Sequence, residues 1–136
     1  MNVIVCLDER DGMMFNGRRQ SCDRILLEDM AKMTEGARLF ASPYSERMLR
    51  EYGLIPIVAE DFLGIAEQSD WCFLEDRALS AHADRLERLV IYRWNRHYPS
   101  DLTFDIVPEH RGLRLLQRVE FSGCSHDTIT KEVFER

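Results

Sequence analysis

The segment NVIVCL at residues 2–7, followed by the polar run DERDG at residues 8–12, decides the fold of this chain. Its residues are almost continuously apolar and rich in β-branched side chains, which is typical of a strand buried on both faces of a sheet. The loop that follows contains two glycines and reaches Ser21-Cys22-Asp23, where we expect a helix to begin. Because a buried strand, a loop and a helix start meet here, the sequence predicts a ligand cleft at this place.

Length and composition describe one ordinary globular domain. The chain has 136 residues, of which 45% are hydrophobic and 31% are charged. A net charge of −6 argues against nucleic acid and against an anionic membrane as partners, since both attract a cationic surface. No apolar run approaches the roughly twenty residues that a membrane span needs, and Met1 leads into a strand without a signal peptide. We therefore expect a cytoplasmic protein.

The four cysteines support a reducing location. Cys6, Cys22, Cys72 and Cys124 lie far apart, without a CxxC pair. Cys6 and Cys72 fall within predicted strands, where a small free thiol packs as an apolar side chain. We expect all four to be free thiols.

Strand and helix patterns alternate along the first two thirds of the chain. Strands are predicted at residues 2–7, 38–41, 54–58, 71–74 and 86–94, and helices at residues 21–34, 43–52 and 60–68. Such repeated crossovers imply a mostly parallel sheet with helices on both faces. Residues 102–106, 113–121 and 128–134 form three further strand-like runs that predict an antiparallel end. The fold class is therefore α/β, with a single domain over residues 1–136.

Two residues refine this prediction locally. Pro56 cannot donate to a strand ladder, so residues 54–58 are expected at a sheet edge. Ser21 is expected to cap the first helix, with Asp23 in the first turn, where a carboxylate complements the positive end of the helix dipole.

The order of these segments resembles the dihydrofolate reductase family. Residues 3–7 followed by Asp11-Gly12-Met13 are similar to the family's first strand and the mobile loop that closes over its site. The helix from Ser21 is similar to the one that carries the family's acidic residue, which makes Asp23 the nearest match. Residues 89–101 and 121–136 are similar to a later strand and to the final hairpin. The resemblance covers most of the chain and implies a dihydrofolate reductase-like fold, with a central sheet, flanking helices and an antiparallel C-terminal hairpin.

The family's cofactor motifs are not matched. The family holds its nicotinamide dinucleotide with a basic Gly-Arg-Lys/His-Thr turn after the second strand and with a Gly-Gly pair after a later strand. Here the corresponding places hold Ala41-Ser42-Pro43-Tyr44 and Leu74-Glu75-Asp76. Carboxylates in place of glycines repel a pyrophosphate. The sequence therefore predicts a degenerate relative that lacks standard NADPH binding and whose cofactor is unknown.

Candidate site residues gather around the predicted cleft. Asp23 is the candidate catalytic residue, either as an acid that protonates or holds a ring nitrogen or, with more weight, as a structural residue at the helix start. Arg18, Arg19 and Gln20 are candidate ligand-binding residues for a phosphate or carboxylate, with a solvated basic loop as the equal alternative.

Two further stretches carry aromatic or reactive groups. Trp94 and Asn95, at a strand end, are candidates to stack on and hydrogen-bond a planar ligand, or else belong to a packed strand terminus. Residues 122–127 (SGCSHD) combine a thiol, hydroxyls, an imidazole and a carboxylate, but neighbours on a turn rarely align for catalysis, so a turn is favoured. The scattered histidines predict no metal site.

Three functions follow, in order of preference. The first is a small-molecule binding protein for a planar or anionic metabolite. The second is a non-catalytic assembly module, a homodimer with Met13, Met14 and Phe15 as its anchor, because adjacent apolar side chains in a loop are costly to leave in water. The third is a divergent reductase.

Overall fold

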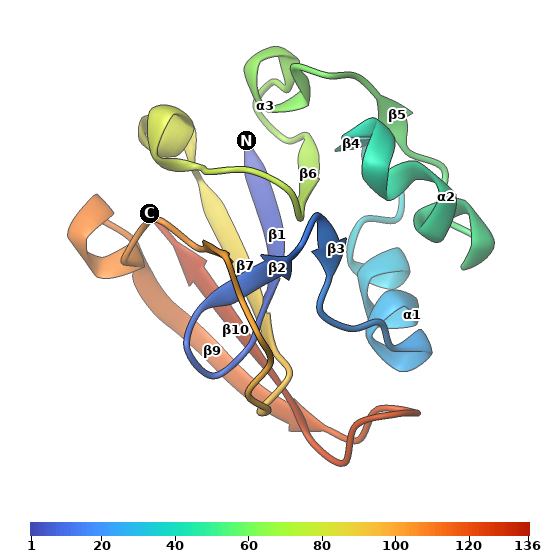
Figure 1. Ribbon diagram of the computed structural model, residues 1–136. Helices are drawn as coiled ribbons and strands as arrows, with labels where there is room; N and C mark the ends of the chain where they lie inside the picture. Colours follow the sequence, from blue (N-terminus) through green and yellow to red (C-terminus); the bar gives the residue numbers. More distant parts are fainter.

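The computed structural model describes residues 1–136 and contains one main sheet. Seven strands form it, in the order β5 (Ile57–Val58), β4 (Leu39–Ala41), β6 (Trp71–Leu74), β1 (Asn2–Leu7), β7 (Arg88–Arg93), β10 (Ile129–Glu135) and β9 (Arg114–Phe121). Strand β1 lies in the middle, hydrogen-bonded in parallel to both β6 and β7 (Figure 1). Strands β9 and β10 form the antiparallel end. The predicted α/β fold, with a mostly parallel sheet and an antiparallel C-terminal hairpin, is confirmed.

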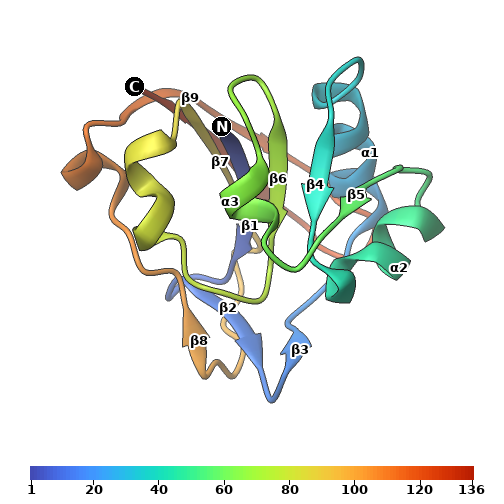
Figure 2. The same ribbon diagram turned by 90° about the horizontal axis from the view of Figure 1, so that it is seen from above.

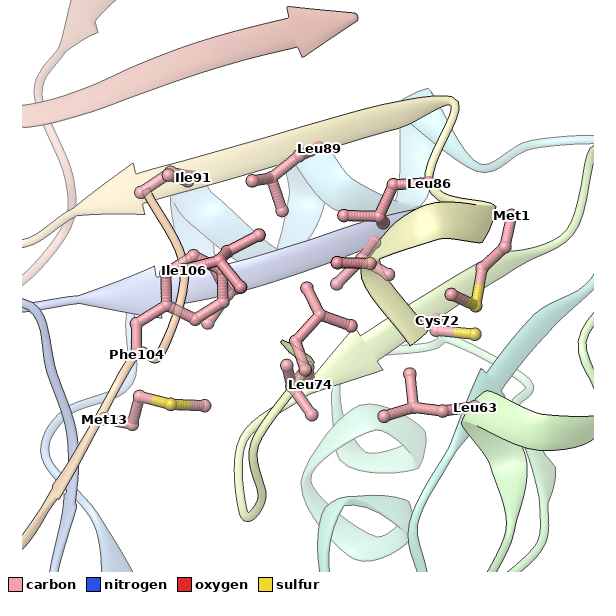
Figure 3. Close-up of a cluster of buried hydrophobic side chains, with 14 of the residues drawn as sticks. Met1, Met13, Leu63, Cys72, Leu74, Leu86, Leu89, Ile91, Phe104 and Ile106 are labelled. Carbon is pink, nitrogen blue, oxygen red and sulfur yellow. The ribbon is translucent and has the colours of Figure 1, made fainter. Parts of the chain in front are cut away.

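Two hydrophobic clusters cover the two faces of this sheet. Because side chains alternate along a strand, Val3, Val5 and Leu7 of β1 enter one cluster and Ile4 enters the other. The cluster with Val3 packs under α3 (Phe62–Ile65) and the 3₁₀ helix η1 (Ser80–Arg85), as the side chains in Figure 3 show. The cluster with Ile4 packs under α1 (Arg24–Met33) and α2 (Pro43–Glu51). Both faces are therefore covered, as a parallel sheet requires.

A second, small sheet was not predicted. It consists of β3 (Arg18–Arg19), β2 (Gly12–Phe15) and β8 (Leu102–Thr103), in that order, and lies beyond one end of the main sheet (Figure 2). Residues 102–106 thus contribute their strand to this small sheet and not to the antiparallel end of the main one. A further 3₁₀ helix, η2 (Pro108–Arg111), connects it to β9.

Burial of β2 changes the basis of the predicted homodimer. Met13 and Met14 are 4% and 5% exposed and belong to the protein's own core, while Phe15 is 49% exposed. The expectation that three adjacent apolar side chains face water was therefore wrong, because only Phe15 does so.

The helix boundaries differ from the prediction in two places. The cap of α1 is Asp23 and not Ser21, so the helix begins at Arg24. Helix α3 is shorter than the predicted residues 60–68, and its Ile65 is 49% exposed. Strand β5 lies at the sheet edge, as Pro56 predicted. None of the helices combines the length and the apolar character needed to cross a membrane.

Candidate functional site

A cavity lies where the parallel strands end and α1 begins. Cys6 comes from β1, Leu74 and Glu75 from the end of β6, and Trp94 directly follows β7. Nine of the fourteen lining residues are hydrophobic, and the full lining is Cys6, Met13, Arg19, Gln20, Ser21, Cys22, Asp23, Leu26, Leu27, Met48, Phe73, Leu74, Glu75 and Trp94. The space open to the centre of a water molecule is about 20 Å³, enough for one or two waters. The cavity is thus a narrow, largely apolar slot at the edge where open α/β sheets bind ligands.

The cavity brings together four of the predicted residues and leaves two outside. Arg19, Gln20, Asp23 and Trp94 all line it. Arg18 is exposed on β3 and is not part of the lining. Asn95 also lies outside, where its Nδ2 donates to the backbone oxygen of Thr128 at 3.1 Å and to Thr130 Oγ1 at 2.9 Å. Asn95 therefore ties the end of β7 to the start of β10.

Arg19 is held by an acidic partner. Its Nε and Nη2 donate to the two carboxylate oxygens of Glu75 at 2.9 Å and 3.1 Å. Glu75 also accepts from Ser45 Oγ at 2.7 Å, and the Arg19 guanidinium lies 4.7 Å from the centre of the Tyr44 ring. Arg19 was expected to attract an anionic ligand and Glu75 to repel one. Because the two side chains pair with each other, the charge of each is neutralised.

Gln20 carries an unpaired acceptor. Its Nε2 donates to Asp8 Oδ2 at 3.0 Å, and Asp8 is fully buried and also accepts from the backbone N–H of Gly12 at 2.7 Å. The Oε1 atom of Gln20 is buried and has no hydrogen-bond partner. A buried acceptor without a donor is costly, so a donor on a ligand in the cavity would be favourable there.

Asp23 is the centre of a buried polar cluster. It is 1% exposed, caps α1 by accepting from the backbone N–H of Ile25 at 2.9 Å, and also accepts from the backbone N–H groups of Cys124 at 3.1 Å and Ser125 at 2.9 Å. Burial raises the pKa of Asp23, but the hydrogen bonds from Ser125, His126 and Cys124 together lower that pKa well below its usual value. The carboxylate therefore stays charged and fixes residues 122–127 to the start of α1.

His126 completes this cluster, and its position was not predicted. The residue is 3% exposed, and its ring stacks on Trp94 with 4.5 Å between ring centres. Its Nδ1 lies 3.0 Å from Asp23 Oδ2, and its Nε2 lies 3.0 Å from Ser21 Oγ and 3.2 Å from the Tyr98 hydroxyl. An ionised carboxylate only accepts, so Nδ1 carries the proton in the neutral ring and Nε2 is left as an acceptor.

The sequence indicated that the segment around His126 is unusual, but it did not indicate which residues His126 contacts. Residues 122–127 have an unusual composition, and they form the predicted turn, in which the Gly123 N–H donates to the backbone oxygen of His126. However, Asp23 and Ser21 are separated from His126 by 103 and 105 positions, so no local spacing indicated these two partners. No group of three or more potential metal ligands is clustered in the chain.

Comparison with known proteins identifies a solved structure of similar fold. No family model and no curated protein matches this sequence. Among solved structures, it is similar to a dihydrofolate reductase from Enterococcus faecalis complexed with NADP(H) and RAB-propyl. The two share 12% sequence identity over 99% of this chain and 95% of the other, with a TM-score of 0.68. The chain therefore has a dihydrofolate reductase-like fold, and the resemblance found in its sequence is confirmed at that level.

Proposed function

We propose that this chain of dihydrofolate reductase-like fold binds a small planar metabolite in the cavity beside Asp23, without standard NADPH-dependent catalysis. The observation that carries the proposal is the cavity itself, which joins the carboxyl ends of β1 and β6 to the start of α1. Its mostly apolar lining with a few polar groups is the usual composition of a small-molecule site.

The lining suggests the chemistry of the ligand. Leu26, Leu27 and Phe73 offer apolar surface to a flat ring, and the buried acceptor Gln20 Oε1 has no hydrogen-bond donor within the protein. These groups favour a planar heterocycle with an N–H or O–H group. An anionic substituent is less well served, because Glu75 occupies Arg19, and Arg18 would have to reach in from outside.

The residues at the places of the family's cofactor motifs do not fit a dinucleotide. Ser42 is fully buried ahead of α2, and the Glu75 side chain is 9% exposed and held by Arg19. A pyrophosphate placed there would have to break that pair and lie against the released carboxylate. A fluorescence titration with NADPH is therefore expected to show no saturable binding. Tight binding would contradict this expectation and would favour the third function, a divergent reductase.

Ligand entry requires movement of the lining. The space for one or two waters is far smaller than a heterocycle, so binding must displace side chains. The small sheet supplies both Met13 and Arg19, and Arg19 is joined to the main sheet through Glu75. We expect the Arg19–Glu75 pair to open when a ligand enters.

A thermal-shift screen tests the proposal. Flat nitrogen heterocycles, including pterins, purines and their nucleotides, are added to the purified protein, and binding raises the melting temperature by mass action. Cys22→Phe fills the cavity and should abolish the shift. Cys124→Phe places the same ring on an exposed cysteine outside the lining and should retain it. A screen without hits, or a shift that survives Cys22→Phe, contradicts the proposal.

An exposed edge strand supports homodimer assembly as a second candidate function. Strand β9 is the outer strand at the hairpin end of the main sheet, and its Leu115, Leu116 and Val119 are 40%, 53% and 40% exposed. A long edge strand that exposes apolar side chains is a template for pairing with another strand. Light scattering at micromolar concentration should then show a dimer that Val119→Lys converts to a monomer. A monomeric wild-type protein would exclude it.

A further inference from the structure

We propose that Ser21, His126 and Asp23 form a nucleophile, base and positioning group that hydrolyse a small carboxylic ester held in the cavity. The inference rests on the proposed function, since it uses the same cavity for its substrate. It goes further by assigning an activity and a substrate class to it.

The geometry is that of an activated hydroxyl. Asp23 Oδ2 accepts from His126 Nδ1 at 3.0 Å, and His126 Nε2 faces Ser21 Oγ at 3.0 Å. Asp23 fixes the ring as the tautomer whose free lone pair lies on Nε2, which is the atom that must take the serine proton. The stacking of the ring on Trp94 holds its plane in place.

Ser21 is the one hydroxyl that satisfies both requirements of a nucleophile here. It contacts Nε2, and it lines the cavity as a half-buried residue. Tyr98 also reaches Nε2, at 3.2 Å, but does not line the cavity. Ser125 lies on the other side of the ring, where its Oγ donates to Asp23 at 3.1 Å.

Donors for a developing oxyanion are also nearby. The backbone N–H groups of Cys22 and Asp23 donate to no other group of the chain, and both residues line the cavity. The amide that follows a nucleophile is a frequent oxyanion donor. These groups stand just before α1, whose positive end further favours negative charge.

The reaction balances with water as the second reactant. Ser21 Oγ attacks the ester carbonyl carbon while its proton moves to His126 Nε2. The carbon–oxygen bond to the alcohol then breaks, and the alcohol leaves with that proton, giving an acyl-serine. Water attacks the acyl carbon and gives a proton to Nε2, and Ser21 takes the proton back as the carboxylic acid leaves.

The first test identifies the nucleophile directly. The wild-type protein is treated with a small alkyl fluorophosphonate, and the modified residue is mapped by mass spectrometry. Labelling at Ser21 is expected, and it should be lost in Ser21→Ala and kept in Ser122→Ala, an exposed serine outside the cavity lining. No labelling, or labelling only at Tyr98 or a cysteine, overturns the proposal.

The second test measures turnover of p-nitrophenyl acetate and butyrate. Ser21→Ala should lower the rate at least about 100-fold. Asp23→Asn keeps an oxygen to cap α1 but presents an N–H to the ring, so it should lower kcat with little change in KM. A purely structural role for Asp23 predicts no such separation when both variants remain folded by circular dichroism, and equal rates in wild type and Ser21→Ala overturn the proposal.

The two proposals fail separately. Thermal-shift hits without Ser21 labelling would leave the binding function and remove the hydrolase. Labelling and turnover without any heterocycle hit would remove the proposed ligand class and keep the nucleophile.

Discussion

At the scale of single residues, Asp23 combines two roles that are usually separate. Its carboxylate accepts from the helix amide of Ile25 and from the turn amides of Cys124 and Ser125, and it also orients His126. A buried charge of this kind is tolerable only because each oxygen is satisfied by donors. Stability and site geometry therefore depend on the same side chain.

Replacement of this carboxylate should be costly. Asp23→Ala leaves several buried N–H groups without an acceptor and removes the cap of α1. We expect the free energy of unfolding to fall by about 3 kcal/mol, measured by urea denaturation. Asp127→Ala, at an exposed position of the same turn, should change it by less than about 0.5 kcal/mol. Equal effects of the two variants would show that the cluster contributes nothing.

At the scale of elements, the turn at residues 122–127 packs closely on the start of α1. A Cβ atom on Gly123 would lie 2.9 Å from Ile129 Cδ1 and nearer still to the carboxyl group of Asp23. Position 123 therefore has no room for a side chain between the turn and the start of α1.

A methyl group at Gly123 should force the turn away from the helix. We expect Gly123→Ala to lower the free energy of unfolding by about 1–3 kcal/mol, because the carboxylate and Ile129 cannot both withdraw. Movement of His126 off the Trp94 ring should also change the tryptophan fluorescence of the folded protein. Ser122→Ala, on the neighbouring exposed residue, should do neither. A fully stable Gly123→Ala protein with unchanged fluorescence would contradict this packing.

The positions of some strands follow from local sequence patterns, and the positions of others do not. Strand β1 and its central place followed from local apolar pattern, and β5 at the edge followed from Pro56. Strand β2 pairs with β3 across Asn16-Gly17, a typical two-residue hairpin turn that the sequence analysis did not use, and with β8, which lies far along the chain and which no local pattern indicates.

The cap of α1 was misassigned for the same kind of reason. Ser21 and Asp23 are both good caps, and donors from residues 124 and 125 fix the carboxylate beside the helix start. Four of the predicted residues line the cavity, because they lie near the predicted ends of the strands and of the first helix. His126 was not, since only the folded chain places it there.

At the scale of the whole molecule, several buried or paired carboxyl groups link stability to pH. Burial raises the pKa of Glu132, but hydrogen bonds from Arg118 and Arg93 lower it below its usual value, and the pKa values of Asp8, Asp23, Asp70 and Asp105 are also lowered. A carboxyl group with a depressed folded-state pKa stabilises the fold above its unfolded pKa, and the stabilisation is lost as the pH falls through its folded pKa.

The protein should therefore lose stability in acid. We expect the free energy of unfolding, from urea denaturation at successive pH values, to be level above about pH 5 and to fall steadily towards about pH 2. Glu132→Gln should make that slope shallower, because it removes one of the contributing groups. Exposed Glu120→Gln should leave the slope unchanged. A stability that stays constant down to about pH 2 would contradict the assignment.

The contact between Ser21, Asp23 and His126 joins the beginning of the chain to its last tenth. During synthesis the ribosome exposes the first helix long before the imidazole emerges, so in the nascent protein the Asp23 carboxylate can cap α1 but has none of its donors from residues 124–126. The base reaches the cavity only when the segment after β9 docks, so a polypeptide truncated before residue 122 would keep the residues that line the cavity but would lack His126. A separate peptide of residues 122–136 would then have to pair with both β7 and β9 to restore that base.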